Sequence, residues 1–186
     1  MKSTFTRRSF ALGALATTTL GACSNGIGSG GASTIDARVD TTLNALYTSY
    51  PGVRDLASRA NGMLVMPLIT EVGLGLGGSF GRGALRIGES TVDYYSAASG
   101  SAGLQIGAQQ YSHVLFFMTQ DALMEFRQSP GWAAGADIEY AVSNQGEMLR
   151  AETTTSLSPV IAVVFGQTGL RLGATLEGTK YTRIIP

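Results

Sequence analysis

One set of polar residues has the types and order expected of a serine hydrolase. Residues 77–81 satisfy the pattern G-x-S-x-G, and Asp93 and His113 follow the serine along the chain. In such an enzyme the serine hydroxyl attacks a carbonyl while the histidine takes up its proton. The pattern works only on a sharp turn from a strand into a helix, and no helical pattern follows here, while His113 lies in a strand-like run. We therefore expect Ser79 and His113 to be structural and predict that the protein is not an enzyme.

Cofactor and metal patterns are equally weak. Residues 73–78 satisfy the dinucleotide pattern G-x-G-x-x-G, but a nucleotide site needs a helix directly after it, and residues 79–83 form a poor helix. Asp137 and Glu139 are spaced to share one face of a strand, although calcium requires more oxygen ligands than two carboxylates. We predict neither a cofactor nor a metal.

Cys23 is the only cysteine, and it ends the motif Leu20-Gly21-Ala22-Cys23, which resembles a bacterial lipobox. In such signals the cysteine sulfur is lipidated, the chain is cleaved just before it, and the new amine is acylated. Arg7-Arg8 followed by Phe10 resemble a twin-arginine export signal, and the apolar stretch after them is too short to span a bilayer. We predict that residues 1–22 are a signal peptide and that Cys23 carries the lipid. The alternative is an unmodified cysteine in an ordinary signal peptide.

The charge balance argues against nucleic acid as a partner. The chain has 13 basic and 13 acidic residues, and loss of the signal would leave ten basic residues against thirteen acidic ones. Nucleic-acid binding requires a dense basic face. The basic residues are nevertheless grouped in two segments, 73–88 and 168–186, whereas residues 121–152 are mainly acidic. If the two basic segments are neighbours, they form an anion-binding patch; otherwise their charges only promote solubility.

The order of the expected elements favours an α+β fold. A Gly/Ser linker over residues 24–34 precedes a helix over 35–49, whose apolar residues recur every three or four positions. Pro51 ends this helix and starts a second one, and a third short helix is expected over 120–128. Between and after them we expect strands at 63–69, 73–80, 83–88, 91–98, 103–109, 111–118, 160–165, 168–175 and 178–184. The fold class is therefore N-terminal helices followed by a mostly antiparallel, strongly curved or barrel-like sheet with one inserted short helix.

A repeated glycine pattern needs an explanation of its own. Segments 73–77, 103–107 and 169–173 all read G-L-x-[LI]-G, which places glycines on one face of a strand and apolar side chains on the other. The bare face either allows close packing or bending of the sheet, or it forms the floor of a ligand groove.

Several ordered motifs resemble the SYLF domain, also called the Ysc84 domain, over residues 36–186 of the chain. The matching segments are 62–67, 77–85, 94–101, 103–109, 115–119 and 165–170. The resemblance implies a membrane adaptor that binds phosphoinositide-like lipids; the actin bundling of the fungal members does not transfer to a bacterial envelope protein.

These observations together predict a SYLF domain at 35–186, following the lipidated Cys23 and its linker. We expect an exported lipoprotein held at the periplasmic face or the surface of the outer membrane, whose domain binds anionic phospholipids on a membrane surface. The residues expected to contact phosphate are Arg82, Arg86, Arg171, Lys180 and Arg183. The alternative is a structural or protein-interaction module of the cell envelope, with an envelope protein as partner and the glycine face or a sheet edge as its docking site.

Overall fold

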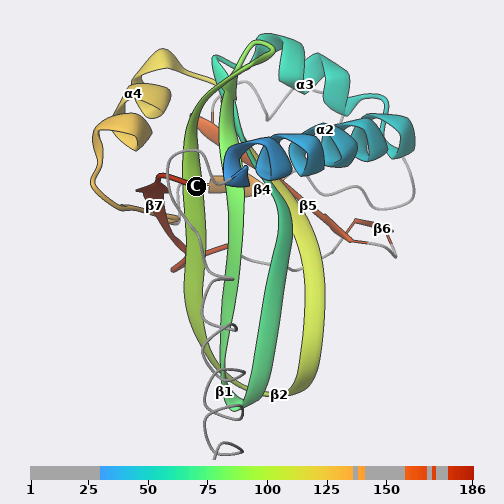
Figure 1. The fold of residues 1–186 in the computed structure, drawn as a ribbon, viewed down its shortest axis with the longest axis vertical. Coiled ribbons are helices and arrows are strands. Elements are labelled where there is room, and N and C mark those ends of the chain that lie inside the picture. The colour runs from blue at the N-terminus through green and yellow to red at the C-terminus, as the bar shows by residue number, and fades with distance from the viewer. Residues whose placement is uncertain (1–29, 136–137, 141–157, 167–168, 171–175) are drawn as a thin grey trace, which may run out of the picture.

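The fold is α+β, as the sequence predicts, with the helices first and then a strongly curved, mostly antiparallel sheet (Figure 1). It is taken from a computed structural model that describes residues 30–135, 138–140, 158–166, 169–170 and 176–186. The predicted signal peptide, Cys23, Asp137 and Arg171 lie outside the described residues. The elements are α2 (Gly31–Ser49), α3 (Val53–Arg59), β1 (Gly62–Ile87), β2 (Ser90–Phe117), α4 (Gln120–Gln128), β3 (Trp132–Ala133), β4 (Ile138–Tyr140), β5 (Val160–Gly166), β6 (Gly169–Leu170) and β7 (Lys180–Ile184).

The three helices follow the patterns in the sequence. Helix α2 begins at Gly31, four residues before the predicted start, and it buries Ile35, Val39 and Leu46 from its apolar stripe. Helix α4 has the predicted bounds, because the Thr119 side chain accepts a hydrogen bond from the backbone N–H of Ala122 and caps its first turn. No helix in the described part of the chain is both long and apolar enough to cross a membrane.

The strands differ from the prediction, because the short strands expected between residues 63 and 118 are joined into β1 and β2. These two strands pair antiparallel from Gly62↔Phe117 to Ile87↔Ser90, across a two-residue turn. Gly88 in that turn has φ 60, a left-handed conformation that glycine adopts without strain. Other glycines that the sequence indicates as turns lie inside extended strands.

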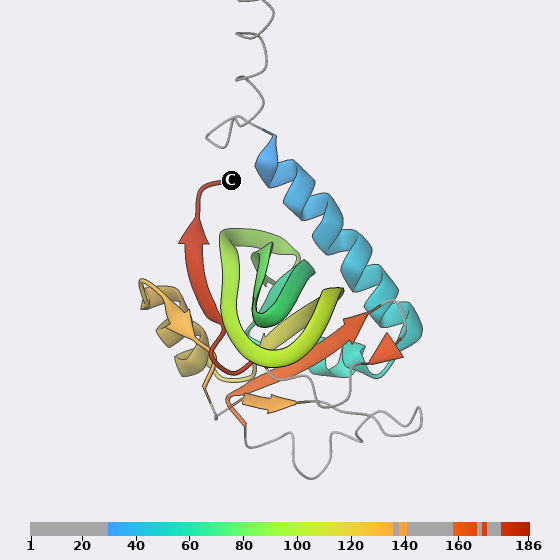
Figure 2. The ribbon, with the colours of Figure 1, turned by 90° about the horizontal axis from the view of Figure 1, so that it is seen from below.

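The long hairpin folds back on itself at the end far from the helices, as Figure 1 shows from the side and Figure 2 from below. The β1–β2 register shifts between Leu74 and Leu76, within the glycine-rich segment. A methyl group on Gly83 would overlap the carbonyl oxygen of Val65, and one on Gly81 would overlap that of Leu68. These two glycines therefore let the second half of β1 pack against the backbone of its first half, and glycine here serves close packing.

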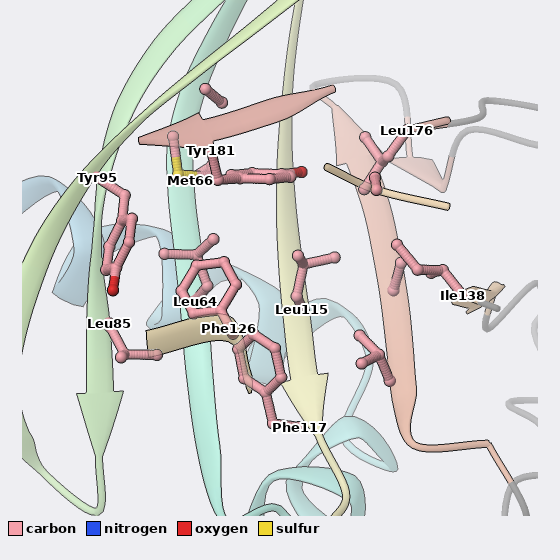
Figure 3. Packing of buried hydrophobic residues seen from close by; sticks show 14 of the residues in the cluster. Leu64, Met66, Leu85, Tyr95, Leu115, Phe117, Phe126, Ile138, Leu176 and Tyr181 are labelled. Atoms are coloured by element: carbon pink, nitrogen blue, oxygen red, sulfur yellow. The ribbon is translucent and has the colours of Figure 1, made fainter. Parts of the chain in front are cut away.

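Both faces of the curved sheet are covered by apolar side chains. The strand order is β3-β7-β2-β5-β4, with β1 paired to β2 and β6 paired to β5. Among the described strands, the β4–β5 pair alone is parallel. Inside the curve, Figure 3 shows a core that joins β1, β2, β5 and β7 with Phe126 of α4. On the outer face, α2 and α3 cover a second cluster that includes Val39, Val65 and Phe116. Helix α2 is thereby held against the sheet, and this packing fixes the position of α2 relative to β1.

Candidate functional site

The hydrolase-like residues are not brought together. The Ser79 hydroxyl lies 2.7 Å from that of Ser99 on the neighbouring strand, and Asp93 forms ion pairs with Arg127 and Arg183. His113 is fully buried in β2, and its Nε2 lies 2.8 Å from the hydroxyl of Tyr181. Burial lowers the pKa of the His113 imidazole to about 3, so the ring is neutral at physiological pH. Ser79, Asp93 and His113 therefore have separate structural partners, and no proton relay joins them.

The cofactor patterns also fall in regular structure. Residues 73–78 form part of β1, and the chain continues as a strand to Ile87, so no helix N-terminus follows the glycines. Among the described residues, no group of three histidine, cysteine, aspartate or glutamate side chains could hold a metal ion.

Arg86, one of the predicted phosphate contacts, is bound to α2. Its Nη2 lies 2.7 Å from Asp40 Oδ1 and 3.9 Å from Asp36 Oδ1, and its Nη1 donates to the backbone oxygen of Glu89 at 2.9 Å. The side chain is only 12% exposed. Asp36 also accepts hydrogen bonds from Tyr94 and Thr91 on β2. A phosphate could reach Arg86 only by displacing these acids, so the geometry favours a role in clamping α2 to the sheet.

Two further predicted contacts, Arg183 and Lys180, lie on β7. Arg183 pairs with Asp93 at 3.4 Å and donates to the backbone oxygen of Arg127 at 2.9 Å, which ties β7 to β2 and α4. Lys180 is exposed and pairs in the sheet with Ala98, which in turn pairs with Phe80. Directly paired residues point to the same face, so Lys180 shares a face with Phe80 and lies two strands away from it, about 10 Å.

Arg82 is the predicted contact that lies at a groove. This groove, about 430 Å³ in volume, runs between the start of α2 and β1. Its lining includes Arg82, Phe80 and Leu68 from the sheet and Arg38 from the helix, with no acidic residue among the described residues that form it. Arg82 also lies over the Phe80 ring, 6.0 Å from its centroid. We call this surface the basic groove.

Arg38 is the residue that the sequence analysis missed. It lies in the same helix as Asp36 and Asp40, so the charges of this segment cancel when they are counted along the chain. On a helix, residues two positions apart point in nearly opposite directions, whereas residues four apart share a face. The two acids accordingly contact Arg86, while Arg38 lines the groove. A helical projection of residues 35–49 could have separated these charges.

The basic groove combines positive charge with exposed apolar surface. Phe80 is 52% exposed and Leu68 is 38% exposed, although both are large apolar side chains. Helix α2 begins at the groove, which Gly30 and Gly31 line. Its N-cap residue makes no side-chain capping hydrogen bond, and its first turn contains no acidic residue. The positive end of the helix dipole therefore adds to the two arginines. This combination suits a ligand with an anionic part and an apolar part.

The fold and the groove together define the candidate site: a curved sheet, clamped under a helix, with a basic groove at the helix start. Residues 98–183, a little under half of the chain, match the family model Ysc84, described as Las17-binding protein actin regulator. The resemblance to the SYLF domain is thus confirmed. No curated protein matches the chain.

Proposed function

We propose that the domain binds anionic phospholipid head groups at a membrane surface, with the phosphate held at the basic groove. The observation that carries the proposal is that Arg38 and Arg82 line one groove, with no acid among its described lining residues, beside the exposed Phe80 and Leu68. Arginine can grip two phosphate oxygens, and each basic residue near an anionic membrane contributes about 1 kcal/mol. The apolar side chains would enter the interface beside the head groups. The match of residues 98–183 to the Ysc84 family model supports lipid or protein binding in general.

Within this proposal the five predicted residues take different roles. Arg82 binds phosphate, and Lys180, on the same sheet face as Phe80, adds attraction at the edge of the site. Arg86 and Arg183 hold the structure through their acids, and Arg171 lies outside the described residues.

The proposed lipid anchor is compatible with this orientation. Cys23 precedes Gly30, which lines the basic groove, by only seven residues. A chain of that length spans at most about 25 Å. A protein that is exported and lipidated at Cys23 would therefore keep the groove close to the membrane, as expected at the periplasmic face or the surface of the outer membrane. Labelling with radioactive palmitate tests this step, since the full chain should be labelled and a Cys23→Ser variant should not.

The binding test uses the full chain carrying Cys23→Ser, which removes the anchor. Co-sedimentation is measured with neutral vesicles and with vesicles that contain anionic phospholipid, at low and high salt. We expect salt-sensitive binding to the anionic vesicles alone, because screening weakens exposed charges. Arg38→Ala and Arg82→Ala should each weaken binding roughly fivefold, the factor corresponding to about 1 kcal/mol. Arg59→Ala, an exposed arginine on α3, is the matched control.

Two results would overturn the proposal: no binding to anionic vesicles at either salt concentration, or equal loss of binding in Arg82→Ala and Arg59→Ala. Absence of binding to anionic vesicles would favour a second candidate function, a protein-docking module of the envelope. The description of the matching family model, which names a protein-binding member, supports this candidate. Binding to an envelope protein through apolar contacts would be insensitive to salt.

A further inference from the structure

A second groove continues from the basic groove along α2. It measures about 680 Å³ and lies between the C-terminal half of α2, the bent part of β1, and the facing parts of β2 and β5. Pro67 and Leu68 line both grooves, so the two are contiguous at this point. We call the second one the neutral groove.

A single face of α2 forms one wall of both grooves. Thr34 and Arg38 line the basic groove, and Thr42, Ala45 and Ser49 line the neutral groove. These positions are spaced by three or four residues, which places them in one row along the helix. The clamp between Arg86 and the acids of α2 holds the helix from another side, so the row keeps its position above the sheet.

The two grooves differ in charge. The described residues that line the basic groove include two arginines and no acid, whereas those that line the neutral groove include no charged side chain. The lining of the neutral groove includes the exposed Leu68, the buried Leu46 and Phe165, and Pro67. Uncharged polar side chains also line it, among them Thr42, Ser49 and Gln110. Each groove has a volume typical of small-molecule sites. The matching ligand has a negative head and a narrow apolar tail, joined at the position of Leu68.

We propose that the neutral groove takes one acyl chain of the anionic lipid whose head group lies at Arg38 and Arg82. This inference rests on the proposed function and extends it. The domain does not only touch the membrane surface but draws one lipid chain out of the bilayer and along α2. The affinity of such a site depends on tail length, because each buried methylene group raises it about fourfold, the factor that about 0.8 kcal/mol corresponds to. A site for head groups alone has no such dependence.

The test measures the affinity of water-soluble alkyl phosphates by titration calorimetry. The full chain carrying Cys23→Ser is titrated with hexyl, octyl and decyl phosphate below their micelle concentrations, and with inorganic phosphate and a neutral alkyl maltoside as references. We expect the affinity to increase about fourfold per methylene group across the series. Arg82→Ala should weaken binding of all three alkyl phosphates by a common factor and leave this dependence on length unchanged.

Groove-filling variants locate the tail. Ala45 and Ser49 are exposed and line the neutral groove, so Ala45→Trp and Ser49→Trp should fill it without disturbing the core, and both should abolish the dependence on length. Asn44→Trp, at an exposed position of α2 outside the groove lining, is the matched control and should keep it. Melting temperatures of the variants verify that each one folds.

The outcomes separate the two proposals. Equal affinities for hexyl and decyl phosphate, or an unchanged dependence on length in both filled variants, would refute the acyl-chain site. Salt-sensitive binding to anionic vesicles would then still support the head-group site. Failure to bind either anionic vesicles or alkyl phosphates would refute both proposals. Saturable binding of the neutral maltoside alone would refute the requirement for an anionic head group and point to an uncharged amphiphile as the occupant.

Discussion

Replacement of Arg86 by alanine should destabilise the domain, whereas replacement of Arg82 should weaken lipid binding. The two arginines lie four residues apart on β1 and were grouped as phosphate contacts from sequence. In the structure Arg86 has a 12% exposed side chain and three oxygen partners, while Arg82 is exposed and lines the basic groove. The pair therefore provides a direct comparison between a residue that contacts α2 and one that we propose contacts ligand.

The expected loss of stability follows from the contacts of Arg86. Its ion pair with Asp40 joins a partner that is 58% exposed, so we discount it to well under 1 kcal/mol. Its hydrogen bond to the Glu89 backbone oxygen comes from a nearly buried charged group and contributes about 1.5 kcal/mol or somewhat more. Together these predict a loss of about 2 kcal/mol. For a domain of this size that lowers the melting temperature by roughly 4–8 °C.

The assay is thermal unfolding followed by circular dichroism, in parallel with vesicle co-sedimentation at a temperature where both variants are folded. Arg86→Ala should melt lower and retain head-group binding, and Arg82→Ala should melt like the wild type and bind less. Our reasoning would be refuted if Arg86→Ala melted like the wild type and lost binding as strongly as Arg82→Ala. That result would make Arg86 a ligand contact despite its acidic partners.

Three further substitutions, one of them with a matched control, test other parts of the fold. Gly83→Ala should lower the free energy of unfolding by about 2–3 kcal/mol or prevent folding, because the added methyl group would overlap a neighbouring carbonyl. Gly100→Ala is the control: its methyl group meets nothing within 4 Å, so the variant should melt like the wild type. The folded state protonates His113 only near pH 3 and the unfolded chain near pH 6.5, so stability should fall as the pH drops below about 6.5. In the His113→Gln variant, the slope of the unfolding free energy against pH should be smaller by up to about 1.4 kcal/mol per pH unit. Urea denaturation from about pH 7 to about pH 4 measures this slope. An equal slope in both proteins would contradict the burial of a neutral His113. Thr119→Ala should lower the free energy of unfolding by about 1 kcal/mol through loss of the α4 cap, and no change in the denaturant midpoint would argue against the cap.

The helices were predictable because their signals are local. The apolar spacing of residues 35–46, the position of Pro51 and the cap at Thr119 each act within one or two helical turns. The predicted strand boundaries were wrong because the signals that set them are not local. Gly81 and Gly83 resemble turn residues in sequence, but they serve a contact with residues about fifteen positions earlier in the same strand. A single sequence gives the same pattern for both uses of glycine.

The candidate site was only partly predictable, since its composition depends on which face of α2 contacts the sheet. The basic segment 73–88 predicts Arg82 as a phosphate contact; the structure places Arg82 at a groove, and its role there stays a prediction. The ion pair between Arg86 and Asp40 could not be predicted, because the two residues lie 46 positions apart along the chain. Asp93 is equally uninformative in sequence, yet it pairs with arginines from α4 and β7. Charges can be counted from sequence, but their pairing is a tertiary property.

Helix α2 connects stability and binding, because its charged residues are divided between two sides. If Asp36 and Asp40 were free, they would cancel the positive potential of Arg38 within one helical turn, and the groove would not attract anions. Their contacts with Arg86, Thr91 and Tyr94 use these acids to hold the helix in place. Burial and the hydrogen bond to Asp36 also raise the pKa of Tyr94, which keeps its phenol a donor in that clamp. The clamp therefore has two consequences: it keeps α2 at the sheet, and it holds Asp36 and Asp40 on a different side of the helix from Arg38, which lines the basic groove with Arg82.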